Sequence, residues 1–416
     1  MAGNLIGRIL GPLLQILVAR ILLPSDFGVF AIVLAVVAML EVVRDLGFTQ
    51  AVIVDHAEKD YLPMQFTAQL IMAFVLFACI VMLTPLAVDL FSQPELATIL
   101  PIVGCVVFLM AGSDPVITCL LKNQNYRALS FRQVLMPLVT GITGLVLAYQ
   151  GYGVYSLVFG LLAGHFANTI FLVWLYHDQF RLAWQPDVLV RLFIFGRHII
   201  MQRLSGFFVN QADSFFVSIN LGAGSLGIYR LGNQLALLLP SLVFPQVAQV
   251  LFTEFSSRKD KSSIAGLYYH YIRWSGGLLL VYSILAYLLV HFLVEWMLGN
   301  HWLSIVPVIQ VIAVVSATGY LAALNVEAAK SLGIVRPYTV FAILRSLATI
   351  TAVIIASTYS LQAVVVTWVC TGLLANVVNE IVFHRCQDLV RLRPEKLVIY
   401  LCAWLWAWYV IRHVQL

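Results

Sequence analysis

Charged residues are scarce in this chain of 416 residues, which holds 24 Lys and Arg and 19 Asp and Glu, 10% of the sequence in all. Hydrophobic residues supply 62% of it. A folded chain with so few charges cannot cover its whole surface with groups that face water. The composition therefore excludes an ordinary water-soluble protein and indicates one that lies in a lipid bilayer.

Cysteines and enzyme motifs are scarce as well. The six cysteines include no Cys-x-x-Cys pair, so we expect reduced, structural thiols. The sequence contains no HExxH, GxSxG, P-loop or DxD motif. The longest stretch between apolar runs, about residues 177–199, is too short for a folded soluble domain. We therefore expect neither an enzyme nor a bound cofactor.

Long apolar runs, in contrast, are abundant. Runs of about 20 residues, enough to cross the hydrocarbon core as a helix, follow one another with short breaks. They predict spans at 4–22, 28–50, 63–88, 97–121, 132–150, 153–176, 200–220, 227–252, 268–293, 303–327, 337–357, 361–383 and 397–411. The first run has no basic segment before it and no small-residue cleavage site after it, so we expect a retained helix rather than a signal peptide.

The chain also carries an internal repeat. Ala19–Phe30 (ARILLPSDFGVF) matches Ser218–Tyr229 (SINLGAGSLGIY) at an offset of 199, which aligns Gly28 with Gly227. Two related hydrophobic halves are typical of secondary transporters, whose substrate site lies between the halves. We therefore expect an all-α polytopic membrane protein with two pseudo-symmetric six-helix bundles and a shortened thirteenth helix. The predicted parts are a six-helix lobe at 1–176, an amphipathic cytoplasmic linker at 177–199, a second six-helix lobe at 200–383, and a basic cytoplasmic loop with the extra helix at 384–416.

Lys and Arg collect in every second predicted loop, for example Lys122, Arg127 and Arg132 in one of them. Cytoplasmic loops of membrane proteins carry the excess of Lys and Arg, so we expect a cytoplasmic N-terminus. The net charge of +5 follows from this asymmetry, and we do not take it as a sign of nucleic-acid binding. Anionic membrane lipids are partners that such flanking basic residues can bind.

Polar residues recur on one face of two predicted spans that correspond in the repeat. They are Asn4, Arg8, Gly11 and Gln15 on the first span, and Arg203, Gly206, Asn210 and Ser214, with Asp213 beside them, on the seventh. The eighth span continues this polar surface with Arg230, Asn233 and Gln234. Ionisable groups inside a membrane are costly and usually functional, so the two faces predict a hydrated cavity. The alternative is that these residues only hold helices together through hydrogen bonds.

Other charged residues fall within the predicted spans too. Glu41 and Arg44 are three residues apart on the second span and predict an ion pair on one helix face. Asp114 is a further intramembrane charge. His165 begins a polar patch with Asn168 on the sixth span, and we expect this histidine to be a packing residue.

Two segments resemble a known family. Residues 17–53 are similar to the opening of bacterial polysaccharide transporters of the Wzx type, which are lipid-linked oligosaccharide flippases of the multidrug/oligosaccharidyl-lipid/polysaccharide exporter superfamily. Residues 195–234 resemble the opening of the second half in that family, where an N-x-x-D pair, here Asn210 and Asp213, precedes LGA-x-x-LG-x-Y. The resemblance covers nearly the whole chain and is fairly specific to the exopolysaccharide and colanic-acid-exporter-like branch. Relatives commonly have fourteen spans, and we expect the thirteen predicted here to alter stability or partner contacts rather than transport.

The resemblance implies a flippase that carries undecaprenyl-diphosphate-linked oligosaccharides across the bacterial inner membrane by alternating access of two lobes. The residues expected to hold the diphosphate are Arg8, Arg203, Arg230 and Arg345, and those expected to contact the glycan are Asn4, Gln15, Asn210, Asn233 and Gln234. Asp213 is the candidate for coupling transport to a proton or sodium ion. The expected partners are the lipid-linked oligosaccharide, membrane lipids, and the polysaccharide polymerase with its chain-length and export machinery.

Two other functions stay open. A multidrug or cation antiporter of the same superfamily would favour an acidic, aromatic-lined cavity over an arginine-rich one. A membrane-embedded polysaccharide polymerase or ligase would carry a sizeable outer loop with catalytic residues, and no predicted loop is long enough to provide one.

Overall fold

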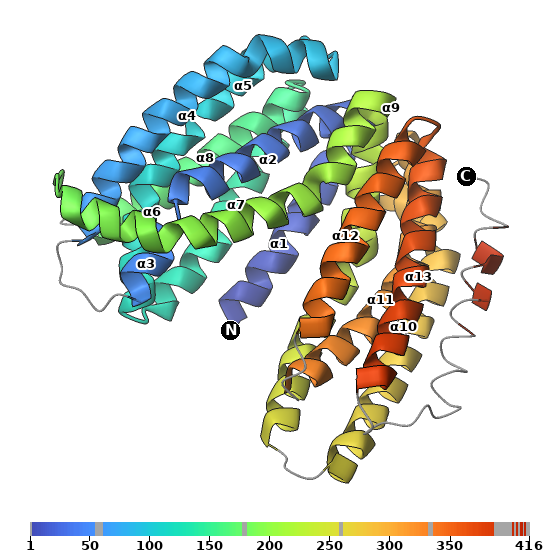
Figure 1. Ribbon diagram of the computed structural model, residues 1–416. Helices are drawn as coiled ribbons and strands as arrows, with labels where there is room; N and C mark the ends of the chain where they lie inside the picture. The colour runs from blue at the N-terminus through green and yellow to red at the C-terminus, as the bar shows by residue number, and fades with distance from the viewer. Residues whose placement is uncertain are drawn as a thin grey trace. The chain divides into compact units, whose positions relative to one another are not determined.

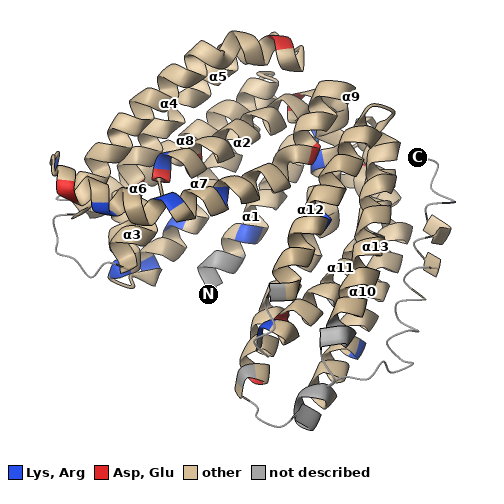
Figure 2. Ribbon diagram, in the orientation of Figure 1, with Lys and Arg blue, Asp and Glu red and all other residues tan. Residues whose placement is uncertain are grey.

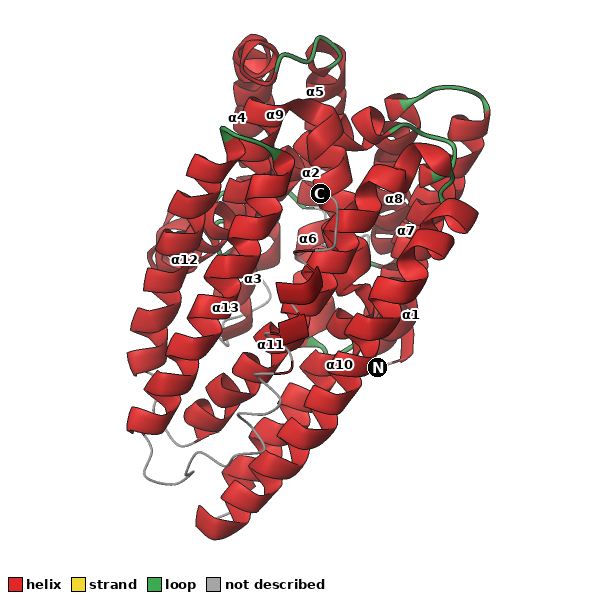
Figure 3. Ribbon diagram, turned by 90° about the vertical axis from the view of Figure 1, so that its right-hand side faces the viewer, coloured by secondary structure: helices red, strands yellow, loops and turns green. Residues whose placement is uncertain are grey.

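The computed structural model describes residues 2–54, 61–176, 181–257, 261–331 and 336–386, together with isolated residues between 402 and 412. Throughout this described part every regular element is a helix (Figure 3). Helices satisfy their backbone hydrogen bonds internally, and an apolar chain in a bilayer requires this because no water reaches it there. The prediction of an all-α polytopic protein is confirmed.

The helices divide into two compact units, and the first comprises Met1–Gly227. Its helices, which Figure 1 labels, are α1 (Ala2–Ala19), α2 (Pro24–Asp45), α3 (Phe48–Val54), α4 (Tyr61–Phe91), α5 (Leu96–Gly104), α6 (Val106–Lys122), α7 (Tyr126–Tyr149), α8 (Val154–Leu175) and the first part of α9 (Pro186–Ser257). Helix α7 packs against α1 and α8, and α6 packs against α2, α4 and α8. These contacts surround the inner face of α2, the helix with the longest run of buried residues near its start.

The second unit comprises Ile228–Leu416. It holds the rest of α9, then α10 (Lys261–Met297), the short 3-10 helix η2 (Asn300–Ile305), α11 (Val306–Ser331), α12 (Arg336–Ser357) and α13 (Leu361–Cys386). Helix α11 packs against α10 and α13, and α13 also packs against α12. A buried polar network ties three of these helices together, because Asn325 of α11 accepts a hydrogen bond from Tyr268 of α10 and donates one to Glu380 of α13.

Twelve of the thirteen predicted spans lie on helices, and nine stretches of the described residues are long and apolar enough to cross a membrane. The predicted spans at 200–220 and 227–252 both lie on α9, which consists of two helices that meet at a kink at Gly222, where φ is 80°. The predicted span at 28–50 ends early, because the chain turns after Asp45 and starts α3. The thirteenth span and most of the region 384–416 lie outside the described residues.

The two glycines that the predicted repeat aligns lie against each other. A Cβ added to Gly227 on α9 would come within 2.9 Å of the backbone nitrogen of Gly28 on α2. A Cβ added to Gly28 would come within 2.8 Å of the Cα atom of Ala223 and would overlap that residue's carbonyl group. The backbones of α2 and α9 therefore touch at this crossing, which only residues without a side chain allow.

Candidate functional site

A cavity with charged walls lies inside the first unit. Figure 2 shows how few charged residues the helices carry along most of their length. This cavity, which we call the charged cavity, has a volume of about 240 Å³. It is lined by Glu41, Arg44 and Asp45 of α2, Thr49 of α3, Met110, Ser113, Asp114 and Ile117 of α6, Arg132 and Met136 of α7, His165 and Asn168 of α8, and Arg203 of α9.

A tight turn positions Asp45 at one side of the charged cavity. Helix α2 ends at Asp45, and the chain reverses through Leu46 (φ 49°) and Gly47 (φ 71°) before α3 begins. The Oδ1 atom of Asp45 accepts a hydrogen bond from the Thr49 hydroxyl (2.7 Å) and a longer one from the Thr49 backbone N–H (3.4 Å). A carboxylate at the start of a helix is stabilised by the free N–H groups there. The Asp45 carboxylate is therefore held in place by its own turn.

Helix α9 brings Arg203 to this carboxylate. Gly196 of α9 packs directly on the turn, since an added Cβ would overlap the carbonyl oxygen of Leu46. Arg203 follows seven residues later, which places it on the same helix face. Its Nη1 atom lies 2.5 Å from Oδ2 of Asp45, and the side chains of Arg203 and Asp45 are 34% and 7% exposed.

A second ion pair is much more deeply buried. Nη2 of Arg44 lies 2.6 Å from Oδ2 of Asp114, and the two side chains are 4% and 15% exposed. Gln69 of α4 donates to the same carboxylate oxygen at 3.4 Å. The Nε and Nη1 atoms of Arg44 are buried and have no hydrogen-bond partner among the described residues. Buried donors are nearly always satisfied in proteins, so these two N–H groups indicate room for an acceptor in the charged cavity.

Arg132 is the third cation of the charged cavity. Its Nε donates to Oδ1 of Asn168 at 2.9 Å, and Asn168 is itself buried. Within the described part of the chain, no carboxylate oxygen lies within 4.0 Å of an Arg132 nitrogen or pairs with it. Glu41 lines the same cavity, is exposed, and forms no ion pair with a described residue. One cation and one anion of the charged cavity therefore have no described charge partner.

Two sequence-based predictions about these residues are wrong. Glu41 and Arg44 do not pair with each other, because Arg44 turns to Asp114 of α6 instead. Arg132 is not a loop residue, because α7 begins at Tyr126 and carries Arg132 into the charged cavity.

Of the residues predicted to bind substrate, Arg203 is the one that lines the charged cavity. Arg8 is exposed on α1, and Gln15 lines a separate cavity of about 260 Å³ between α1 and α7. Asn210 is exposed on α9, seven residues beyond Arg203. The Asn4 side chain lies outside the described residues.

Asp213, the predicted coupling residue, is half-buried on α9. Its Oδ1 atom accepts hydrogen bonds from the backbone N–H and the hydroxyl of Ser214, at 2.6 and 3.2 Å. The other predicted residues belong to the second unit, and they are Arg230, Asn233, Gln234 and Arg345. Of these, Arg345 is exposed on α12, and the buried Oδ1 atom of Asn233 has no hydrogen-bond partner among the described residues. Their roles stay predictions.

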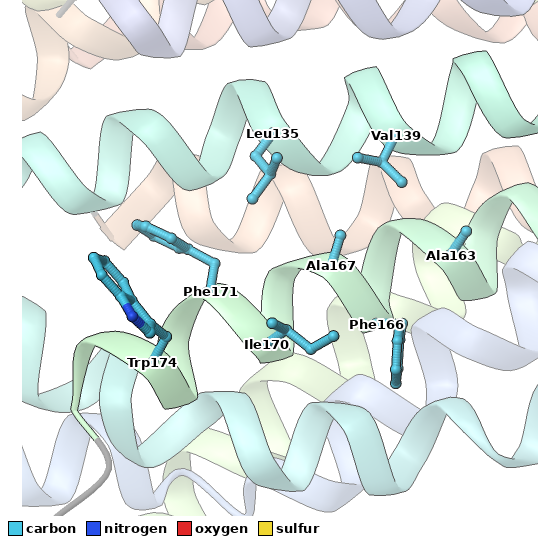
Figure 4. Close-up of a pocket in the computed structure, with 8 residues that line it drawn as sticks. All are labelled: Leu135, Val139, Ala163, Phe166, Ala167, Ile170, Phe171 and Trp174. Carbon is cyan, nitrogen blue, oxygen red and sulfur yellow. The ribbon is translucent and has the colours of Figure 1, made fainter.

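Helices α7 and α8 also form an apolar groove of about 520 Å³, shown in Figure 4. It is lined by Leu135, Val139, Ala163, Phe166, Ala167, Ile170, Phe171 and Trp174. The side chains of Phe166, Ile170 and Trp174 are 56%, 52% and 76% exposed. Large apolar groups on the outside of membrane helices face lipid. The same two helices therefore carry an apolar outer surface and, through Arg132 and Asn168, part of the charged cavity.

The helices define a polytopic membrane protein whose first unit contains the charged cavity. The fold is shared with the lipid II flippase MurJ in its inward closed conformation, at a TM-score of 0.74 and 14% sequence identity, over 98% of this chain and 97% of that one. It is also shared with an inward-facing multidrug resistance MATE family transporter, at a TM-score of 0.68 and 12% identity, over 98% of this chain and 96% of that one.

The chain belongs to the family described as polysaccharide biosynthesis protein, whose model matches residues 17–307. It is similar to the succinoglycan biosynthesis transport protein ExoT of Rhizobium meliloti, with 27% identity over 58% of this chain and 49% of ExoT. It is also similar to the lipopolysaccharide biosynthesis protein WzxC of Escherichia coli, with 22% identity over 74% of this chain and 63% of WzxC. The chain thus spans about half to two thirds of the length of these curated relatives.

Proposed function

We propose that this protein moves lipid-linked oligosaccharides across the bacterial inner membrane for the synthesis of a surface polysaccharide. The family supports this proposal, because ExoT and WzxC are named for transport in succinoglycan biosynthesis and for lipopolysaccharide biosynthesis. The shared fold of a lipid II flippase supports it as well. We infer that the protein works as a transporter and not as an enzyme, by alternating access of its two halves.

The observation that carries this proposal is the set of unsatisfied cationic groups at the charged cavity. Arg132 has no described carboxylate partner, and the buried Arg44 keeps two N–H groups without an acceptor. Phosphate oxygens form short, strong hydrogen bonds with guanidinium groups, often two at a time. A diphosphate that links a glycan to its lipid would satisfy these donors and also balance the charge of Arg132, whereas a neutral solute would leave that charge without a counter-charge.

The test is transport of a lipid-linked oligosaccharide into proteoliposomes that contain the full chain. Arg132→Ala removes the unpaired cation, and we expect transport to fall at least about tenfold, as for the loss of a charge-assisted hydrogen bond. Arg127→Ala is the matched control, because Arg127 lies on the same helix but is exposed and does not line the charged cavity. Equal transport by the two variants would refute the proposed site, and no transport by the wild-type protein would refute the proposed function.

One observation favours a second function, the export of an organic cation. Glu41 is exposed at the charged cavity and forms no ion pair with a described residue, so a cation could approach it. A multidrug transporter with the same fold is a precedent for such a substrate. Export of a fluorescent organic cation by the same proteoliposomes, with no movement of lipid-linked oligosaccharide, would establish this alternative.

We further propose that transport is coupled to a proton or sodium gradient through Asp213. A half-buried carboxylate on α9 can change its protonation or bind a cation as the surrounding cavity changes its access to water. Transport by Asp213→Asn is expected to become independent of both gradients, and an unchanged response would exclude this role. Membrane lipids and a polysaccharide polymerase with its chain-length and export machinery are the partners that this function implies.

A further inference from the structure

The two ion pairs of the charged cavity differ in how easily they can be opened. Arg44 and Asp114 are almost completely shielded, and Gln69 supports the carboxylate. Arg203 is 34% exposed, although its partner Asp45 is only 7% exposed. A buried pair is strongly destabilised when one partner leaves, because the other charge stays behind without compensation. A half-exposed arginine can exchange its partner at much lower cost.

Asp45 does not depend on Arg203 for its position. Thr49 donates two hydrogen bonds to Oδ1 of Asp45, and Arg203 contacts the other oxygen, Oδ2. After the loss of Arg203, Asp45 would therefore still be held in place by Thr49.

From this geometry we propose that Asp45 is an internal competitor for the anionic group of the substrate at Arg203. The inference rests on the proposed function and names how the same site is regulated. In the resting protein, the Asp45 carboxylate occupies the place on Arg203 that a phosphate oxygen takes when substrate binds. Arg132 lines the same cavity and holds no described carboxylate, so it provides the first contact for the incoming anion.

The exchange has a structural consequence. Arg203 lies on α9 and Asp45 at the end of α2, so their ion pair ties these two helices together. When a diphosphate binds Arg203, the ion pair between Arg203 and Asp45 breaks, while the turn that holds Asp45 remains intact. Substrate binding and the contact between Asp45 and Arg203 are then mutually exclusive. The occupied site would remove this ion pair from the contact between α9 and the end of α2, which links recognition of the anion to the packing of these two helices.

The test is the affinity of the purified full-length protein for inorganic pyrophosphate, measured by calorimetry in detergent. Asp45→Asn removes the competing charge but keeps an oxygen that can accept from Thr49, so pyrophosphate should bind about tenfold more tightly. Glu41→Gln is the matched control, since it removes one negative charge from the same cavity without freeing an arginine. Tightening in Asp45→Asn that clearly exceeds the tightening in Glu41→Gln supports the proposal. Equal tightening in the two variants, or none in Asp45→Asn, overturns it.

A double-mutant cycle separates competition for Arg203 from a general effect of charge. When Arg203 is replaced by Gln, the additional change Asp45→Asn should no longer tighten pyrophosphate binding, because there is no arginine left to free. If Asp45→Asn does not yield folded protein, Asp45→Ser is measured in the same cycle. A gain in affinity that persists without Arg203 would contradict the proposal.

The outcome is also distinct from that of the proposed function. Asp45→Asn could bind pyrophosphate more tightly although the wild-type protein transports no lipid-linked oligosaccharide. This result would support competition by Asp45 and refute the proposed flippase function. The wild-type protein could instead transport the oligosaccharide although neither it nor Asp45→Asn binds pyrophosphate. This result would support the flippase function and refute competition by Asp45.

Discussion

The crossing of α2 and α9 at Gly28 predicts that the substitution Gly28→Ala, which adds one methyl group, destabilises the protein strongly. In Gly28→Ala the added methyl group would lie 2.8 Å from the Cα atom of Ala223 and would overlap its carbonyl group. Ordinary van der Waals contact begins at 3.4 Å, so the two backbones must move apart. The atoms in the way belong to a helix backbone and cannot rotate aside. Overpacking of this kind costs about 1–3 kcal/mol.

The measurement is thermal unfolding of the purified protein in detergent, with Gly224→Ala as the matched control. Gly224 lies on α9 beside Ala223, and a Cβ added there has no neighbour within 4 Å. Alanine at Gly224 should leave the melting temperature unchanged or raise it, because alanine favours the helix. Gly28→Ala should lower it, and so should Gly227→Ala on the other side of the crossing. Equal melting temperatures for Gly28→Ala and Gly224→Ala would refute the close contact.

Three further predictions concern the charged cavity. Arg44→Met should destabilise the protein by about 3–5 kcal/mol in the same melting assay, because it leaves Asp114 buried without its partner. The double variant Arg44→Met with Asp114→Leu should recover much of this lost stability, because it removes the buried charge as well. Gly47→Ala should cost about 1–2 kcal/mol in the same melting assay, because alanine is strained at the positive φ of this turn. Asn168→Ala removes the residue that orients Arg132, so its transport should fall, whereas transport by Arg127→Ala should stay normal. A lower melting temperature without lower transport would argue against this positioning role.

The fold could be predicted well from the sequence because one physical rule dominates it. A chain that is 62% hydrophobic and has continuous apolar runs of about 20 residues crosses a bilayer as helices, and the length of each run sets the approximate length of the helix. The errors lie at local features that hydrophobicity does not register. The end of α2 after Asp45 depends on the positive φ angles of Leu46 and Gly47. The predicted break between the spans at 200–220 and 227–252, in contrast, agrees with the kink at Gly222.

The charged cavity was harder to predict because its residues come from six different helices. Spacing within one helix shows which residues share a face, but not which helix that face meets. Glu41 and Arg44 therefore look like a pair, although Arg44 binds Asp114, which is 70 residues away in the chain. The place of Arg132 in the charged cavity is not predicted for a different reason, since Arg132 stands at the edge of the apolar run 132–150 and is counted with the basic loop before it. The signal that could have found it is Asn125, whose side chain accepts from the N–H of Ala128 and caps the start of α7.

The charged cavity also shows that an anion-binding site inside a membrane need not contain an excess of arginine. Its walls carry three arginines and three carboxylates, namely Arg44, Arg132 and Arg203 with Glu41, Asp45 and Asp114. An uncompensated charge inside a bilayer is costly, so a resting site for an anion has to hold its own counter-charges. The arriving diphosphate needs a cationic partner, and one of the paired arginines provides it when that arginine leaves its carboxylate. Arg44, the partner of Asp114, is only 4% exposed, whereas Arg203, the partner of Asp45, is 34% exposed and can make the exchange. The balance of charge that keeps the empty cavity stable is thus the same property that makes substrate binding break a contact between α2 and α9.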